Sequence, residues 1–307
     1  MILCCGESLI DMVPDQGSFL PLPGGSVYNT TVALGRLGTQ TAYLWPLSQD
    51  SFGDALRVPL EKAGVDLSLC PSTPRLTTLA LVFLNDGHAS YSFYDEGTAG
   101  RMFDVGDLPN LPDDIEALFI GGISLIQDPC GATVEELAHR AAERGLVTMV
   151  DLNIRPNLIG DDRATRERLG ALMRIADIVK ISDDDAAWLF PEHAPEDTVL
   201  QLLELGPKLI LRTHGADGAT GITKTLKVNR QADSVAVADT IGAGDTFNAG
   251  LLTALSEAGV LTRDALDTLD EEALFKALDL ASRAATVTVS RPGANPPWRE
   301  ELEESRG

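Results

Sequence analysis

Short apolar runs rich in β-forming residues alternate along this chain with longer stretches of helical periodicity. The clearest apolar runs cover residues 117–121, 147–151, 178–181 and 209–212. Runs without polar alternation fit strands that are buried on both faces, and their alternation with helices favours βαβ units. We therefore predict an α/β fold with a mainly parallel central sheet flanked by helices.

Three of the flanking helices can be located from the sequence. They are expected over residues 28–37, from Thr133 to Gly145, and over residues 246–258. Thr133 and Glu136 have the spacing of a capping box, and Gly145 suits a C-terminal cap. These features predict that the second helix begins at Thr133.

Two stretches break the alternation. Residues 9–22 are extended and rich in turn residues, and residues 78–94 indicate a hairpin turned at Asn85, Asp86 and Gly87. Neither piece fits a doubly wound sheet. We expect them to form a small separate β-sheet, a lid, from about residues 9–24 and 76–103.

The remaining chain shows no internal repeat and no low-complexity linker. A later hairpin is expected from residues 219–228 with 234–238. The whole chain, 1–307, is therefore predicted to be a single domain that carries the lid.

Composition limits the partners of this chain. Its 307 residues carry 46 acidic and 24 basic side chains, a formal net charge of −22. Such a surface repels nucleic acid and anionic membranes, so neither is an expected partner. No apolar run approaches the ~20 residues that span a bilayer, and the first residues resemble a strand rather than a signal peptide. With four cysteines that lack CxxC spacing, the chain is expected to be cytoplasmic, with reduced thiols.

The run DTIGAGDTFNAG at residues 239–250 carries the strongest chemical signal. Its glycines let backbone N–H groups approach a ligand, and the start of the following helix adds unpaired N–H groups and the positive end of the helix dipole. Such a place favours phosphate. Asp245, a carboxylate in the same place, is suited to accept a proton from a group that attacks the phosphate.

A second glycine cluster precedes the helix expected over residues 28–37. Gly24 and Gly25 would let the backbone approach a ligand, and Asn29 can both donate and accept hydrogen bonds, as sugar hydroxyls require. A tight loop in which Asn29 caps the helix explains the same residues equally well. This cluster by itself does not decide between the two.

Other phosphate-binding motifs are excluded. No Gly-Lys pair occurs, which rules out a P-loop, and Phe247 occupies the third glycine position of the dinucleotide fingerprint. The motif set of protein kinases is also missing. A nicotinamide-dependent oxidoreductase is therefore not expected.

Together, the two glycine clusters and Asp11 resemble the ribokinase-like, or PfkB, family of sugar kinases over essentially the whole chain. The run at residues 239–252 fits the C-terminal signature of that family. Three further segments are similar to family motifs: DxNxR at 151–155, TxGxxG at 213–218, and the tail at 291–296. The resemblance implies a ribokinase-like fold that transfers the γ-phosphoryl group of ATP to a sugar hydroxyl, with Mg²⁺ present.

The resemblance also implies roles for individual residues. Asp245 would be the catalytic base. The anion hole would be formed by Ile241, Gly242, Ala243 and Gly244. The substrate would be bound by Asp11, Gly24, Gly25, Asn29, Tyr91, Phe93, Arg101 and Arg155. The nucleotide would be bound by Lys180, Ser182, Thr213, Gly215, Gly218 and Asn295.

Some positions depart from the family pattern. Val27 and Ser48 stand where the N-terminal signature has other small residues. Ser182 and Asp185 stand where the family has NxxE, the motif that organises Mg²⁺. Asp185 would then hold Mg²⁺ through water, or the acids after Ser182 cap the helix that follows.

Monovalent cation binding is a further implication of the resemblance. In that family a cation such as K⁺ often lies behind the anion hole. Here it would be held near Asp239, Ile241 and residues 286–295.

The identity of the sugar depends on the lid. Residues 91–101 resemble those of fructokinases and of 2-keto-3-deoxygluconate kinases, with Tyr91 and Phe93 offering aromatic faces to a sugar or packing within the lid. A keto acid requires a cation, whereas Asp95 and Glu96 are acidic, although Arg101 and Arg155 could supply one. Fructose is therefore the favoured substrate.

Four alternatives remain open. Three are the enzymes 2-keto-3-deoxygluconate kinase, ribose kinase and nucleoside kinase. The fourth is a non-catalytic sugar-binding regulator. Since lids of this kind often pair in the family, a homodimer through the lid is also expected.

Overall fold

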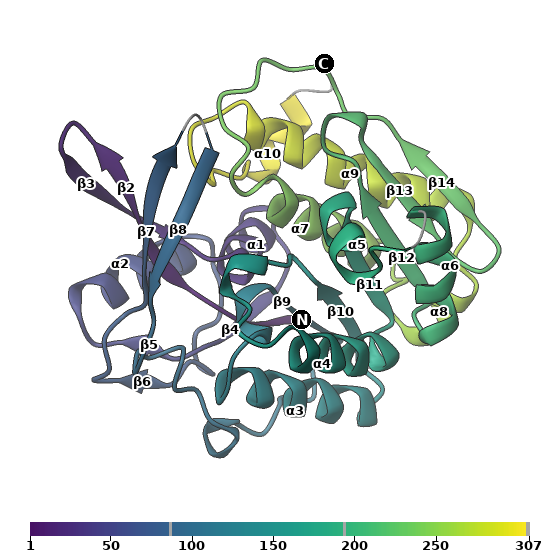
Figure 1. The fold of residues 1–307 in the computed structure, drawn as a ribbon. Coiled ribbons are helices and arrows are strands. Elements are labelled where there is room, and N and C mark those ends of the chain that lie inside the picture. Colours follow the sequence, from purple (N-terminus) through teal and green to yellow (C-terminus); the bar gives the residue numbers. More distant parts are fainter. Residues whose placement is uncertain (86–87, 193–194, 305–307) are drawn as a thin grey trace.

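The computed structural model describes residues 1–85, 88–192 and 195–304 (Figure 1). Its largest element is an eight-stranded sheet with the order β14-β13-β12-β11-β10-β9-β1-β4. The strands from β12 to β4 are parallel, and β13 and β14 extend the sheet as an antiparallel hairpin. Their bounds are β1 Ile2–Cys5, β4 Thr41–Leu44, β9 Ala117–Gly121, β10 Val147–Asp151, β11 Ile178–Ser182, β12 Leu209–Thr213, β13 Ala219–Ile222 and β14 Lys227–Arg230.

Helices cover both faces of this sheet. Those on one face are α1 Ser26–Arg36, α7 Ala243–Glu257 and α9 Glu271–Val289. Those on the other are α3 Cys130–Glu143, α4 Asp162–Ile175, α5 Asp183–Leu189 and α6 Pro195–Leu205. The remaining helices are α2 Ser51–Lys62, α8 Arg263–Asp267 and α10 Arg299–Glu304. None of the helices in the described ranges is both long and apolar enough to cross a membrane.

The predicted central sheet is confirmed. All side chains of β1 and β9 are buried, as expected for parallel strands covered on both faces. Cys4 and Cys5 on β1 are fully buried and act as small apolar core residues. The apolar runs therefore form the centre of the core.

A separate four-stranded sheet stands beside the main body of the molecule (Figure 1). Its order is β3-β2-β7-β8, with bounds β2 Leu9–Asp15, β3 Ser18–Gly24, β7 Leu79–Asn85 and β8 His88–Tyr94. Strands β2 and β7 pair in parallel, so the two stretches that break the alternation do combine into one small sheet. The expected turn residues Asp86 and Gly87 lie outside the described residues. A minor pair, β5 Leu47–Ser48 with β6 Ser72–Thr73, completes the strands.

Several predicted boundaries were wrong. Helix α3 begins at Cys130, before Thr133, whose hydroxyl donates to the carbonyls of Pro129 and Phe103 instead of capping the helix. Glu136 is not part of a capping box but pairs with Arg140 one turn later.

Two further boundaries differ in the C-terminal part. Helix α7 begins at Ala243 rather than Thr246, since Gly242 turns the chain in the left-handed region with φ 76°. Residues 234–238 are irregular, so the late hairpin consists of β13 and β14 alone.

The functional residues collect at one edge of the central sheet. The carboxyl ends of β1, β9, β10, β11 and β12 lie at, or within three residues of, Glu7, Ser124, Asn153, Ser182 and Gly215, respectively. Because parallel strands end at the same edge, these segments become neighbours although they lie far apart in the sequence. Ligand sites in open α/β sheets form at this edge.

Candidate active site

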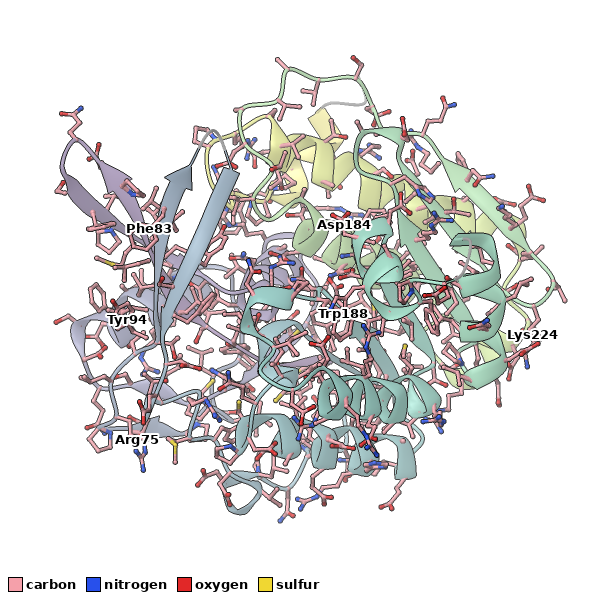
Figure 2. The ribbon with its side chains drawn as sticks, in the orientation of Figure 1. Arg75, Phe83, Tyr94, Asp184, Trp188 and Lys224 are labelled. Atoms are coloured by element: carbon pink, nitrogen blue, oxygen red, sulfur yellow. The ribbon has the colours of Figure 1, made fainter. Side chains whose placement is uncertain are left out.

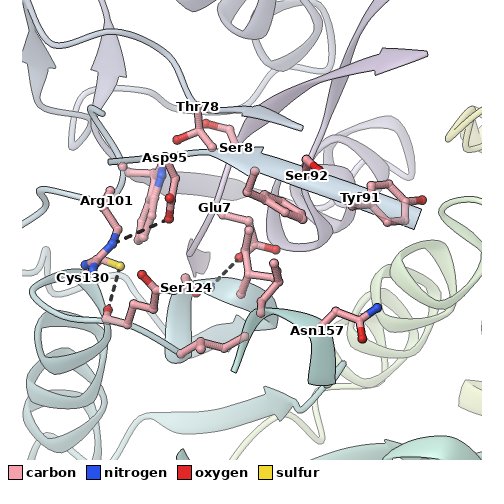
Figure 3. A pocket seen from close by; sticks show the side chains of 17 residues that line it. Glu7, Ser8, Thr78, Tyr91, Ser92, Asp95, Arg101, Ser124, Cys130 and Asn157 are labelled. Atoms are coloured by element: carbon pink, nitrogen blue, oxygen red, sulfur yellow. Dashed lines mark hydrogen bonds and ion pairs between the residues drawn. The ribbon is translucent and has the colours of Figure 1, made fainter. Parts of the chain in front are cut away.

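Several cavities of the described part of the chain lie at this edge, and three of them concern the candidate site. The central cavity, of about 270 Å³, is lined by residues that include Asp11, Asn29 and Asp245. The apolar cavity, of about 510 Å³, lies over the TxGxxG loop. The lid cavity, of about 400 Å³, lies beneath β8 (Figure 3). Gly244 lines both the central and the apolar cavity, so ligands in these two cavities would meet at Gly244.

The turn that leads into α7, residues 239–244, is called the glycine turn. It is held by Asp239. One carboxylate oxygen accepts the N–H of Ile241 at 3.0 Å, and the other accepts the N–H of Gly293 at 2.9 Å. The N–H of Ile241 is thus engaged inside the turn, and that of Ala243 donates to the carbonyl of Thr240 at 3.3 Å. An anion at this turn would therefore be met mainly by the free N–H groups of the first turn of α7.

Asp245, in that first turn, is held by helix α1. The Ser26 hydroxyl donates to Oδ1 at 2.8 Å, and the Asn29 amide donates to Oδ2 at 2.9 Å. Asp245 is 8% exposed, and burial raises its pKa to about 6, although these two hydrogen bonds oppose the rise. Asn29 therefore does not only belong to a tight loop before the helix but also orients Asp245. Ser26 is a second partner of Asp245, which the sequence did not reveal.

Asp11 reaches the same cavity from the lid strand β2. Its carboxylate lies over Gly24, where a Cβ atom would come within 2.2 Å of Oδ2. Burial, with a smaller contribution from the charge of Asp245, raises the pKa of Asp11 to about 6. Asp11 and Asp245 thus face one cavity from two different elements.

Glu7 is a further buried carboxylate that the sequence interpretation missed. One oxygen accepts the N–H of Ser26 at 3.0 Å, and the other accepts the N–H of Ser124 at 3.2 Å. Burial raises the pKa of Glu7 to about 7. Glu7 lines both the central and the lid cavity and ties two of their walls together. Its position two residues after a fully apolar strand was the one available signal.

Lys180 forms a buried ion pair beneath the glycine turn. Its ammonium lies 3.1 Å from each oxygen of Asp151, and the Asn248 amide donates to the same carboxylate at 2.7 Å. Burial alone would lower the pKa of Lys180, but the Asp151 and Asp185 charges outweigh it and raise that pKa. The ammonium therefore stays charged. It lies against Gly244, where a Cβ atom would be 3.2 Å from Nζ.

Ser182 and Asp185 form a capping box at the start of α5. The Ser182 hydroxyl accepts the N–H of Asp185 at 3.0 Å, and Asp185 Oδ2 accepts the N–H of Ser182 at 2.9 Å. Asp185 Oδ1 accepts the N–H of Ile154 at 2.7 Å. The structure thus supports the capping interpretation of these residues, and Asp185 has little free capacity for a metal ion.

The predicted substrate residues divide between two cavities. Tyr91 and Phe93, with ring centroids 6.1 Å apart, line both the central and the lid cavity. Arg155 and Gly25 line the central cavity. Of the central, apolar and lid cavities, Arg101 lines the lid cavity alone.

The predicted nucleotide residues are also divided. Thr213, Gly215 and Gly218 line the apolar cavity together with Phe247. Lys180 lies in the central cavity, beside Gly244. Asn295 is placed differently, because its side-chain oxygen accepts a hydrogen bond from Arg36. A nucleotide contact by Asn295 stays a prediction.

Comparisons with known proteins agree with this geometry. Residues 1–301 match the model of the pfkB family carbohydrate kinases. A fructokinase from Rhizobium leguminosarum bv. trifolii is 46% identical over 279 residues, which are 89% of this chain and 85% of that protein. The structure of a fructokinase with bound ATP from Xylella fastidiosa has a TM-score of 0.90 and 30% identity, covering 99% of this chain and 98% of that one. Aminoimidazole riboside kinase from Salmonella enterica has a TM-score of 0.85 and 28% identity, with 99% and 98% covered.

The buried ion pair gives a prediction for stability. Replacing Asp151 with Ala leaves the Lys180 ammonium buried without its main partner, which should lower the free energy of unfolding by about 3–5 kcal/mol. Asp184→Ala, which removes an exposed carboxylate from α5 (Figure 2), should change it by less than about 0.5 kcal/mol. Denaturant unfolding of both variants measures the difference. Equal stabilities would contradict the role assigned to the pair.

Proposed function

The chain belongs to the pfkB family of carbohydrate kinases, and on this premise we propose that it transfers the γ-phosphoryl group of ATP to a hydroxyl of fructose. The observation that carries the proposal is the position of Gly244 between the central and apolar cavities. Asp245, the next residue, faces the central cavity. A sugar in the central cavity and a nucleotide in the apolar cavity would therefore meet beside Asp245, the carboxylate in the first turn of α7.

We propose Asp245 as the base. With both oxygens already held by Ser26 and Asn29, the carboxylate has a fixed orientation toward an acceptor hydroxyl. Orientation matters more than basicity here, because phosphoryl transfer depends on in-line positioning and a carboxylate is a weak base toward an alcohol. Asp11 and Asn29 would bind hydroxyls of the same sugar.

The phosphoryl group would be stabilised by fixed dipoles and one ammonium. The first-turn N–H groups of α7 point to the place where negative charge develops, and Lys180 lies against Gly244 from below. Arg155 lines the central cavity and could contact the sugar or the transferred group. The apolar lining around Phe247 would hold the nucleotide base.

Magnesium fits this site only as a partner of the nucleotide. Among the described residues, no group of three or more His, Cys, Asp or Glu side chains is placed to hold a metal ion. Asp185 has one oxygen with a single hydrogen bond, so it would reach Mg²⁺ through water. When bound, Mg²⁺ would shield the charge of the phosphates.

Fructose is preferred over a sugar acid on electrostatic grounds. Glu7, Asp11 and Asp245 border the central cavity. Of the cations that border it, Lys180 is already paired with Asp151, which leaves Arg155 to attract a substrate carboxylate against three acids, so the lining disfavours one. The Rhizobium relative is named a fructokinase, which supports the same choice. Because the structure is also similar to a riboside kinase from Salmonella, a nucleoside-like acceptor is the second candidate.

The four-stranded sheet would act as a lid and as a dimer surface. It brings Asp11, Tyr91 and Phe93 to the central cavity. It also exposes the large apolar side chains of Phe83 and Tyr94 (Figure 2), and that of Phe19. We propose that a second copy of the chain covers these side chains in a homodimer.

A coupled assay of ADP formation tests the function. Fructose, 2-keto-3-deoxygluconate, ribose and adenosine are offered in turn with ATP and Mg²⁺, and the highest kcat/KM is expected for fructose. A higher kcat/KM for another acceptor would show that this acceptor, and not fructose, is the preferred substrate. Tight fructose binding without any turnover would instead identify a sugar-binding regulator.

Replacing Asp245 with Asn should lower kcat by at least about 10²-fold, since the variant cannot accept the hydroxyl proton. Fructose binding should stay nearly unchanged, because Asn keeps the shape and can still contact Asn29 and Ser26. Steady-state kinetics and calorimetric titration measure the two effects. A variant with wild-type kcat would exclude Asp245 as the base.

The raised pKa of Asp245 predicts an acid limb in the pH profile. The base works only when deprotonated, so kcat/KM should be full above about pH 7 and fall as the pH drops through about 6. Ser26→Ala removes a hydrogen bond that lowers this pKa, so its limb should move to higher pH, whereas Ser26→Thr should restore the wild-type position. A limb that is identical in Ser26→Ala would show that Ser26 does not tune Asp245.

A monovalent cation would be held near the turn that Asp239 organises. Asp239 joins this turn to the loop at Gly293, which fits a site built from backbone carbonyls of the two segments. The cation would support the glycine turn from behind. Turnover in K⁺ should then exceed turnover in Na⁺ at equal ionic strength, and equal rates would remove this site from the account.

A further inference from the structure

The lid cavity continues the central cavity away from Asp245. Tyr91, Phe93, Glu7, Ile123 and Leu158 line both, so the two cavities share walls. A sugar that places one hydroxyl at Asp245 therefore directs its other end toward the lid cavity. The residues that line only the lid cavity are in a position to read that other end.

The lid cavity contains a charged pair with an unused donor. Arg101 Nε lies 3.6 Å from Asp95 Oδ2, and Figure 3 shows the two side chains facing each other on one wall of the cavity. Arg101 Nη1 is buried and has no hydrogen-bond partner among the described residues. Because a buried donor without an acceptor is costly, this N–H group indicates an oxygen atom that a ligand would supply.

The surroundings of Arg101 determine what kind of oxygen fits. Asp95 lies beside the guanidinium and offsets part of its charge, Cys130 lines the cavity next to Arg101, and Glu7 lies on another wall of the same cavity. A ligand carboxylate would lose its hydration and meet the charge of Asp95, so part of its gain from Arg101 would be cancelled. A hydroxyl, ring or carbonyl oxygen has no such penalty and can accept from Nη1.

We propose that the Asp95–Arg101 pair determines the acceptor specificity of this kinase by binding the uncharged, oxygen-bearing end of the sugar and by rejecting a carboxylate there. The inference rests on the proposed function. It changes the sequence interpretation of Arg101, because the same guanidinium was a candidate receptor for the carboxylate of a keto acid. With Asp95 in place, Arg101 serves a neutral ligand.

Removing the charge of Asp95 tests the proposal. Asp95→Asn keeps the size of the side chain and leaves the Arg101 charge uncompensated. The ratio of kcat/KM for 2-keto-3-deoxygluconate to that for fructose should then rise by about 10-fold or more. Glu96→Gln is the matched control, since it removes an adjacent but exposed carboxylate, and its ratio should stay within about twofold of the wild type.

Arg101→Met supplies a second, independent readout. It removes the donor at the far end of the sugar, so KM for fructose should rise by about 10-fold while kcat changes much less. A folded Asp95→Asn enzyme with an unchanged ratio, or an Arg101→Met enzyme with unchanged KM, would overturn the proposal. A thermal melt shows whether each variant is folded, and if Asp95→Asn is not, the Arg101→Met result decides.

Failure of the proposed function has a different signature. The wild-type enzyme would then show no turnover of fructose. The comparison of Asp95→Asn with the wild type concerns only how a neutral and a carboxylate-bearing acceptor are ranked. If the enzyme phosphorylates fructose but the ratio of kcat/KM for the two acceptors is the same in every variant, the role of the Asp95–Arg101 pair is refuted. The proposed kinase activity would still stand.

Discussion

The hydrogen bonds that hold Asp245 connect the two halves of this protein. Ser26 and Asn29, on the first turn of α1, fix a carboxylate that stands on the first turn of α7, more than two hundred residues later. Glu7 in turn fixes the backbone of Ser26. The orientation of the proposed base therefore depends on the packing of α1 against α7, and the sugar and nucleotide cavities are brought into register by the same contact.

Two of the three cations that line the central and lid cavities have internal carboxylate partners, and Arg155 is the third. Lys180 is paired with Asp151, and Arg101 with Asp95, so neither cation is a free receptor for an anionic substrate. Phosphate would be met by backbone N–H groups at the helix start, with the Lys180 ammonium behind them. Such a site would rely mainly on fixed backbone dipoles in a chain whose net charge is −22.

The sequence predicts the central sheet well, because its strands are short and mostly apolar runs whose burial is decided locally, even where Lys180 interrupts β11. Helix starts were predicted less well. Thr133 has the spacing of a capping residue, yet its hydroxyl bonds to Phe103, which is distant in sequence. Glu7 and Ser26 were missed for the same reason, since their partners become neighbours only when the strands assemble. Asp95 was recognised as acidic, but its pairing with Arg101 could not be derived from spacing.

Direct transfer between ligands that meet at Gly244 is the central claim. It is tested most directly by the stereochemistry at phosphorus, using ATP whose γ-phosphoryl group is made chiral with oxygen isotopes and sulfur. A single in-line transfer from nucleotide to sugar predicts inversion of configuration. Retention would indicate an even number of transfers through a phosphorylated enzyme, and would contradict the account.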